Sequence, residues 1–224
     1  MSEKRISSSF MGILMIGAVW GFAEAALGAV LRACASFVSG SIMTAAALFF
    51  ISTAWVMSRR ILNLVWLVLI VSLIKMFDAR LLSLPIRHGA VANPIFAFWT
   101  EILAFLVILG VAKTALAERR AGQAVVGGLS ALVAVNLFPL VKYATGIPAC
   151  VVPGTGYPLS LYYAPVAIGL SLLTVPLGFW VAEKVLAAEQ RPDAFIRTKA
   201  FARLISPATL ATCLLILVLL RLVT

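Results

Sequence analysis

Long apolar runs, each about the length of a membrane span, follow one another along almost the whole chain. A transmembrane helix needs about 20 mostly apolar residues. Seven runs meet this condition: Phe10–Ala33, Val38–Met57, Ile61–Phe77, Val91–Val111, Gln123–Val141, Leu161–Ala182 and Pro207–Val223. The last run is short, so a count of six stays open if it lies at the membrane interface. The pattern predicts an all-α, polytopic helix bundle that forms a single transmembrane domain over residues 1–224.

The segments between the runs predict the orientation of the bundle. With seven spans, the 18 Lys and Arg residues divide into twelve on the side of the N-terminus and six on the other side. Basic residues concentrate in cytoplasmic loops, so we expect the N-terminus in the cytoplasm and the protein in the inner (plasma) membrane. Two longer connections, Met76–Ala90 and the Pro- and Gly-rich Lys142–Ser160, then lie outside.

Composition excludes several other classes of protein. The chain is 63% hydrophobic and 12% charged, with a mean hydropathy of +1.10, whereas soluble domains are about 45–50% apolar and about 25% charged. A soluble enzyme, a disordered chain and a disulfide scaffold are therefore excluded. The net charge of +10 is explained by residues that fix topology and meet anionic lipid headgroups, and we expect no nucleic-acid partner.

Two carboxylic acids fall deep inside predicted spans. Glu24 lies nine residues before the outer end of the first span, about 14 Å below it at ~1.5 Å per residue. Glu101 lies ten residues after the outer start of the fourth span, about 15 Å deep. Ionisable groups inside a bilayer usually face the bundle interior or a wet cavity. The two acids are therefore expected at one level, either in a pocket or as a structural link between helices.

Other polar residues are expected in the same outer half of the bundle, while the inner halves carry few. Asn136, Lys75 and Lys142 lie near the outer ends of their spans, and Asn93 opens the fourth. Trp20 and Trp99 lie close to the two acids, where aromatic residues serve either as pocket walls or as packing. This asymmetry predicts a pocket open to the outside. Its expected substrate-binding residues are Glu24, Glu101, Asn93, Asn136, Lys75, Lys142, Trp20 and Trp99.

The first span also carries small residues at every fourth position. Gly17, Gly21, Ala25 and Ala29 share one helix face, and such faces let another helix approach closely. Glu24 is offset by about 100° from Ala25, so the acid and the small face point in different directions. The face is expected to dock either a helix of the same chain or a partner subunit.

Catalytic, metal and cofactor motifs are not found in the sequence. His88 is the only histidine, so a His-pair metal site and a Ser–His or Cys–His nucleophile are not expected. We predict no enzyme activity and no cofactor, although carboxylic acid chemistry by Glu24 and Glu101 stays open as an alternative. The glycines at 154 and 156 lack the Lys–Ser/Thr pair of a phosphate loop. Cys34 and Cys150 both fall on the predicted outer side and either form a disulfide or remain unpaired thiols.

The chain resembles one known family in its length, its predicted cytoplasmic N-terminus, its small-residue face and the polar outer connection before Asn93 and Pro94. It is similar to the substrate-binding S components of energy-coupling-factor transporters, which typically have six spans. The resemblance implies that Ala25 and Ala29 contact a transmembrane coupling subunit, and that Glu24, Glu101 and Asn93 bind the ligand near the outer surface. It also implies partner ATPases.

These observations predict a membrane subunit that captures a small polar, vitamin-like solute for uptake. Two alternatives remain open. One is a secondary transporter in which Glu24 or Glu101 relays a proton or cation, and the other is a structural membrane subunit whose acids only join helices.

Overall fold

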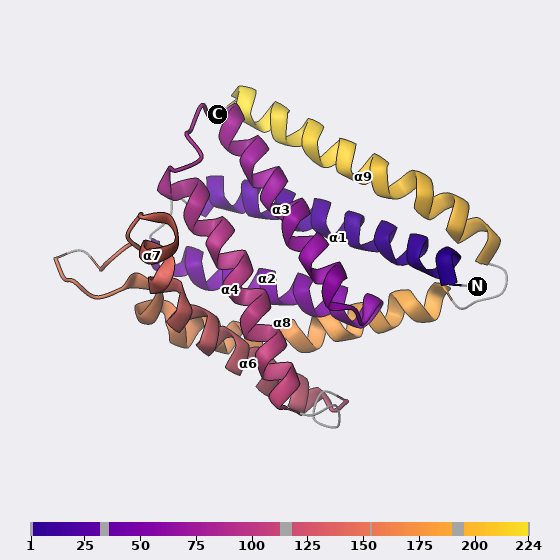
Figure 1. Ribbon diagram of the computed structural model, residues 1–224, viewed down its shortest axis with the longest axis horizontal. Helices are drawn as coiled ribbons and strands as arrows, with labels where there is room; N and C mark the ends of the chain where they lie inside the picture. Colours follow the sequence, from indigo (N-terminus) through magenta and orange to yellow (C-terminus); the bar gives the residue numbers. More distant parts are fainter. Residues whose placement is uncertain (1, 32–35, 113–117, 153, 190–194, 224) are drawn as a thin grey trace.

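The computed structural model describes residues 2–31, 36–112, 118–152, 154–189 and 195–223, which are almost entirely helical. Its long helices run antiparallel to their neighbours in sequence, and the N- and C-termini lie at opposite ends (Figure 1). The helices are α1 (Ser2–Leu31), α2 (Ser36–Ser58), α3 (Ile61–Leu81), α4 (Gly89–Val111), α6 (Arg120–Leu137), η1 (Phe138–Leu140), α7 (Val141–Thr145), α8 (Leu159–Glu189) and α9 (Phe195–Val223).

The described residues contain seven helices that are long and apolar enough to cross a membrane. Each coincides with one of the seven predicted runs, and the seventh, Leu204–Val223, is as apolar as the others. The prediction of an all-helical bundle with seven spans is confirmed. The chain is a multi-pass membrane protein.

The two ends of the bundle differ in their connections. One end, called here the loop end, carries the segment 82–88 and the excursion 146–158, in which Val151 and Pro158 form an isolated antiparallel bridge. The other, called the arginine end, carries the tight turn of Arg59 and Arg60 between α2 and α3 and the start of α6 at Arg120. The sequence analysis predicts that the loop end faces outside.

The third span is longer than the sequence predicted. We expected it to end at Phe77 and Asp78 to lie in a connection, but α3 continues to Leu81. Asp78 is therefore helical and only 2% exposed. The apolar run stops where charged residues begin, but the helix continues because Asp78 has partners inside the bundle, in Lys75 and Arg221.

The main core lies between α1, α2, α3, α4, α6 and α8. Its largest fully buried side chains include Trp20, Phe105 and Leu48. Helix α8 packs against both α2 and α6, and glycines make this possible. A Cβ on Gly127 would collide with the backbone carbonyl of Ser171, and a Cβ on Gly178 would meet that of Phe49. These close approaches fix the spacing of the helices around the core.

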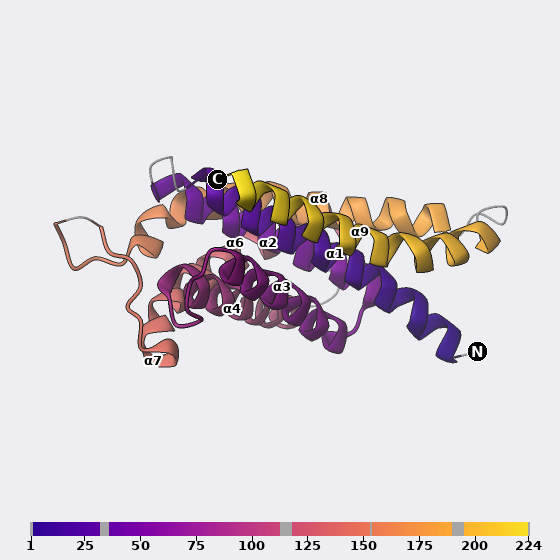
Figure 2. The same ribbon diagram turned by 90° about the horizontal axis from the view of Figure 1, so that it is seen from above.

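Helix α9 lies along one edge of the bundle, beside α1 (Figure 1), and packs against α1 and α3. Figure 2 shows the same helix from above, where it lies along α1. Only 11% of its apolar window is buried. Leu217 is the buried residue at this contact, where it packs with Ala25 and Ile74. The seventh helix is thus peripheral, and it meets the rest of the chain along the small-residue face of α1.

Candidate functional site

The small-residue face of α1 brings α3 and α9 close to Glu24. A Cβ on Gly17 would lie 2.8 Å from Cγ2 of Ile70, and one on Gly21 would lie 2.7 Å from Cδ1 of Ile74. Ala25, one turn further along, is fully buried. Of the two interpretations left open by the sequence, packing within the chain accounts for Gly17, Gly21 and Ala25. The partner-interface interpretation is not supported for them, because the face is already covered by helices of the same chain.

Ala29, the fourth residue of this face, belongs to α1, but its side chain lies outside the described residues. The helix backbone continues through it to Leu31.

Aromatic packing one turn away aligns the two carboxylic acids. Trp20 of α1 contacts Phe98 of α4 edge-on, with ring centroids 5.3 Å apart, and stacks against Phe50 of α2 at 6.1 Å. Residues three or four positions apart share a helix face, so Glu24 follows Trp20 and Glu101 follows Phe98 on the facing sides. Both acids are buried, and they lie within range of electrostatic interaction with each other. The two acids therefore lie near each other, which agrees with the prediction that they share one level.

Lys75 and Asp78 of α3 extend the cluster on the other side of Glu24. Glu24 interacts electrostatically with both of them. The Lys75 ammonium lies 3.9 Å from a carboxylate oxygen of Asp78, and both side chains are buried. A Cβ on Gly28 would be 3.9 Å from Lys75 Nζ, so this cation lies against α1 one turn beyond Glu24. The prediction that Lys75 lies near the acids agrees with this geometry.

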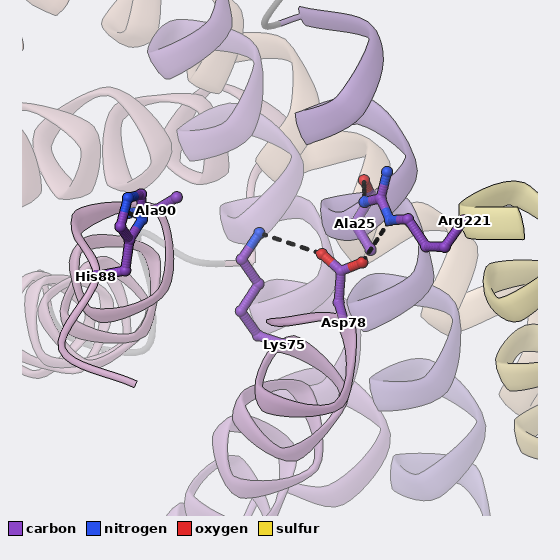
Figure 3. Close-up of polar contacts among 6 residues, drawn as sticks. All are labelled: Ala25, Lys75, Asp78, His88, Ala90 and Arg221. Carbon is purple, nitrogen blue, oxygen red and sulfur yellow. Dashed lines mark hydrogen bonds and ion pairs between the residues drawn. The ribbon is translucent and has the colours of Figure 1, made fainter. Parts of the chain in front are cut away.

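Arg221 near the end of α9 completes the cluster. Its Nε donates to Oδ1 of Asp78 at 2.7 Å, and its Nη2 donates to the backbone carbonyl of Ala25 at 3.1 Å. Lys75 and Arg221 approach the Asp78 carboxylate from opposite sides (Figure 3). The Asp78 carboxylate thus joins α3 to α9, and the Arg221 guanidinium also joins α9 to α1.

Asp78 and Arg221 were not among the site residues predicted from the sequence pattern. Asp78 was assigned to a connection, and Arg221 was used only for topology. Two signals could have found them: the spacing of Lys75 and Asp78, which is that of an i,i+3 pair on a helix, and the position of Arg221 as the one charged residue in Pro207–Val223. A lone buried cation in a span needs an anionic partner.

The carboxyl group of Glu101 has a hydrogen-bond partner, but one of its two oxygens has none in the described part of the chain. Thr44 of α2 hydrogen-bonds its carboxyl group. Its Oε2 is buried and has no hydrogen-bond partner among the described residues. Tyr163 of α8 also lies within electrostatic range of this acid. The vacant acceptor and Glu24 together make this the place in the cluster where a ligand atom or a proton can be held.

Three of the predicted polar residues do not join the cluster in the structure. Asn136 is exposed and donates to the carbonyl of Leu132 in its own helix, at 2.7 Å. Lys142 is exposed on the short helix α7, and Asn93 is partly buried near the start of α4. The buried Oδ1 of Asn93 has no partner among the described residues. These residues lie toward the loop end but are not brought together with Glu24 and Glu101.

The two tryptophans have different surroundings. Trp20 is 1% exposed and belongs to the core, where it packs against Phe50 and Phe98. Trp99 is 40% exposed on the outer surface of the bundle, although it neighbours Glu101 in sequence. The structure therefore places Trp20 as packing that aligns the acids and leaves Trp99 pointing away from them.

Cys150 is an exposed free thiol and Cys213 a half-buried one. Cys34, the predicted disulfide partner of Cys150, lies outside the described residues. Among the described side chains, no group of three or more His, Cys, Asp or Glu residues is placed to hold a metal ion.

A cavity of about 330 Å³ lies at the arginine end, not beside the carboxyl pair. Trp55, Leu109 and Phe179 form its apolar wall, and charged residues form much of the remainder. The polar lining residues lie at or beyond the ends of the predicted spans, so the expectation of few polar residues in the inner halves of the spans stays a prediction. The polar residues that line the cavity come from the ends of α2, α6 and α8, which the hydropathy pattern treats as flanking sequence.

Comparison with known proteins gives no relative for this chain. No protein-family model, no curated protein and no solved structure matches it.

Proposed function

We propose that this membrane protein transports a small polar solute, and that Glu24 and Glu101 bind that solute or the proton or cation that drives its movement. The observation that carries the proposal is the vacant Oε2 of Glu101, buried beside a second acid in the middle of a helix bundle. Intramembrane acids are expensive to bury, and they usually mark solute, ion or proton pathways.

The charge balance of the cluster supports a cationic or protonated occupant. It contains three acids, Glu24, Asp78 and Glu101, and two basic residues, Lys75 and Arg221. Asp78 contacts both basic residues. Counted formally, the cluster has one acid more than it has bases, and a proton, a monovalent cation or the ammonium group of a solute would balance it.

A purely structural role explains only part of the cluster. The contacts of Asp78 and Arg221 join three helices, as a structural link should. Glu101 would serve this purpose poorly, because a buried acceptor without a partner reduces stability. An unsatisfied group of this kind in a native structure calls for an explanation, and a bound ion, proton or solute atom provides one.

Packing of α1 favours transport by this chain alone over capture for a coupling subunit. The resemblance to S components assigns the small-residue face to a partner, whereas α3 and α9 cover Gly17, Gly21 and Ala25 here. We therefore propose a secondary transporter in the inner membrane. If the test below shows binding without uptake, a substrate-capture subunit served by ATPases replaces this proposal.

The test begins with mass spectrometry of small molecules retained by the purified protein. We expect a molecule held by the wild type and reduced about tenfold or more in Glu24→Gln and Glu101→Gln, because a hydrogen bond to a charged group contributes about 1.5–3 kcal/mol. Asn136→Ala and Trp99→Leu are matched controls outside the cluster and should retain it. Equal retention by both Gln variants would contradict the proposed site.

Uptake of the identified molecule is then measured in liposomes that contain only this protein. Accumulation that needs an imposed proton or sodium gradient supports a secondary transporter. Tight binding without uptake in either gradient would instead support a capture subunit that requires partners.

A further inference from the structure

The cavity at the arginine end is a second place where the chain can hold a ligand, far along the bundle from the carboxyl pair. Its volume of about 330 Å³ is at the lower end of the range of small-molecule pockets, about 300–1,000 Å³. Helices α2, α4, α6 and α8 all contribute to its wall. The proposed transport site uses none of these residues.

The charged residues that line the cavity, together with Arg120, which is paired with one of them, fall into two sets. Arg120 forms an ion pair with Glu183 and donates to Oε1 of Gln123 at 3.0 Å, so these three residues satisfy one another. Arg59 and Glu118 also line the cavity, and the described part of the chain gives neither side chain an ion-pair or hydrogen-bond partner. Within the described residues, the cavity therefore presents one cation and one anion that have no side-chain partner.

The backbone of Arg59 is a second, independent indication. Its φ is +51°, in the left-handed region, and its N–H bonds the carbonyl of Trp55 to end α2. Glycine is the usual residue at such a helix end, because a side chain there is strained. Strain of this kind is typical of positions where the side chain has a function. Here the strained residue is one that lines the cavity.

The apolar wall also contains a hydrogen-bond donor, the indole N–H of Trp55. Trp55 lines the cavity together with Phe179 and Leu109, and its buried indole N–H has no acceptor among the described residues. An acid group of a ligand bound to Arg59 would provide that acceptor, since a guanidinium binds planar carboxylates and phosphates through two parallel hydrogen bonds. The apolar remainder of the ligand would lie on Trp55 and Phe179.

We propose that this cavity binds a zwitterion, with its acid group at Arg59 and its primary ammonium group at Glu118. Two sources carry this chemistry: a free amino acid with an apolar side chain, and the headgroup of phosphatidylethanolamine in the surrounding bilayer. Since the ion pair of Arg120 and Glu183 carries no net charge, the described residues around the cavity have no formal excess charge and favour neither a pure anion nor a pure cation.

The free ligand is tested with L-leucine by its effect on the melting temperature of the full-length protein in an uncharged detergent. N-acetyl-L-leucine lacks the ammonium group and L-leucinamide lacks the carboxylate, so both should bind at least about tenfold more weakly. The lipid source is tested in nanodiscs of phosphatidylcholine mixed with phosphatidylethanolamine. Native mass spectrometry should then show phosphatidylethanolamine retained in preference to phosphatidylcholine, whose quaternary ammonium has no N–H for Glu118.

Arg59→Gly separates the function of the side chain from its structural cost. It should raise the melting temperature of the ligand-free protein by about 2–4 °C, because strain is relieved. It should also weaken binding of whichever ligand the wild type binds, L-leucine or phosphatidylethanolamine, by at least about tenfold. Glu118→Gln should weaken binding similarly. Ser83→Gly relieves the other left-handed non-glycine residue, at the loop end, and Arg60→Ala removes the neighbouring charge; both should bind as the wild type does.

The proposal is overturned if neither L-leucine nor phosphatidylethanolamine binds, or if Arg59→Gly and Glu118→Gln bind undiminished. Equal binding of N-acetyl-L-leucine, or of phosphatidylglycerol included in the nanodiscs as an anionic control, would also overturn it, because the site would then recognise an anion only. None of these outcomes bears on the carboxyl pair, whose variants are measured separately.

Discussion

Ion pairs at the two positions in the bundle differ in how far they are removed from solvent. At the pair between Arg221 and Asp78, the side chains are 10% and 3% exposed, whereas at the pair between Arg120 and Glu183 they are 50% and 47% exposed. The first pair joins helices far apart in sequence and lies beside two further acids. The second borders a cavity. The difference indicates that the same residue types hold the fold together in one place and shape an accessible site in the other.

The largest effect is expected from breaking the buried pair. Asp78→Ala leaves Arg221 and Lys75 buried without their shared anion, and it should reduce the free energy of unfolding by about 3–5 kcal/mol. Thermal or denaturant unfolding of the purified protein in detergent measures this. The double variant Asp78→Asn/Arg221→Met removes the buried charge as well as its partner and should recover part of the loss. A single variant as stable as the wild type would contradict the role given to Asp78.

The next effect concerns the close contact that positions Glu24. Gly21→Val places side-chain atoms where Ile74 already lies, and such overpacking typically destabilises by about 1–3 kcal/mol. Because α1 must move away from α3, retention of the small molecule at the carboxyl pair should fall too. Gly169→Ala in α8, where a Cβ meets nothing within 4 Å, is the matched control. If both variants melt alike, the small-residue face does not set the spacing of α1 and α3.

A smaller effect is expected at the exposed pair. Glu183→Gln should change the free energy of unfolding by no more than about 1 kcal/mol, because exposed ion pairs contribute little and are screened by salt. Unfolding at low and high ionic strength measures this, with the Asp78 variant beside it. A loss as large as that of Asp78→Ala would remove the contrast between the two positions.

The last prediction concerns the orientation of the bundle, that is, on which side of the membrane the loop end and the arginine end lie. We expect it to involve no change in stability. Cys150 is exposed at the loop end, and with Cys34 and Cys213 replaced by Ser it should react with a membrane-impermeant maleimide added outside intact cells. In the same background with Cys150→Ser, a cysteine introduced as Arg60→Cys should react only after the cells are opened. The reverse pattern would invert the predicted orientation and place the cavity outside.

The sequence by itself determined the helices and the level of the acids. Hydropathy gives the seven spans because a bilayer imposes one length on every crossing helix, and the constant rise of a helix places Glu24 and Glu101 at one depth. The acids come within electrostatic range of each other because Trp20 and Phe98, one turn away, pack together in the core between the same helices.

Only the tertiary structure decided which polar residues meet. Lys75, Asn136 and Lys142 all lie toward the loop end of their helices, yet only Lys75 turns inward, because rotation about the helix axis depends on packing and not on depth. Arg221 finds Asp78, 143 residues earlier, because α9 docks on the small face of α1, and no local pattern specifies that contact. The cavity at the arginine end arises in the same way, because tertiary packing brings Arg59 and Glu118 to one space that residues of four helices also line.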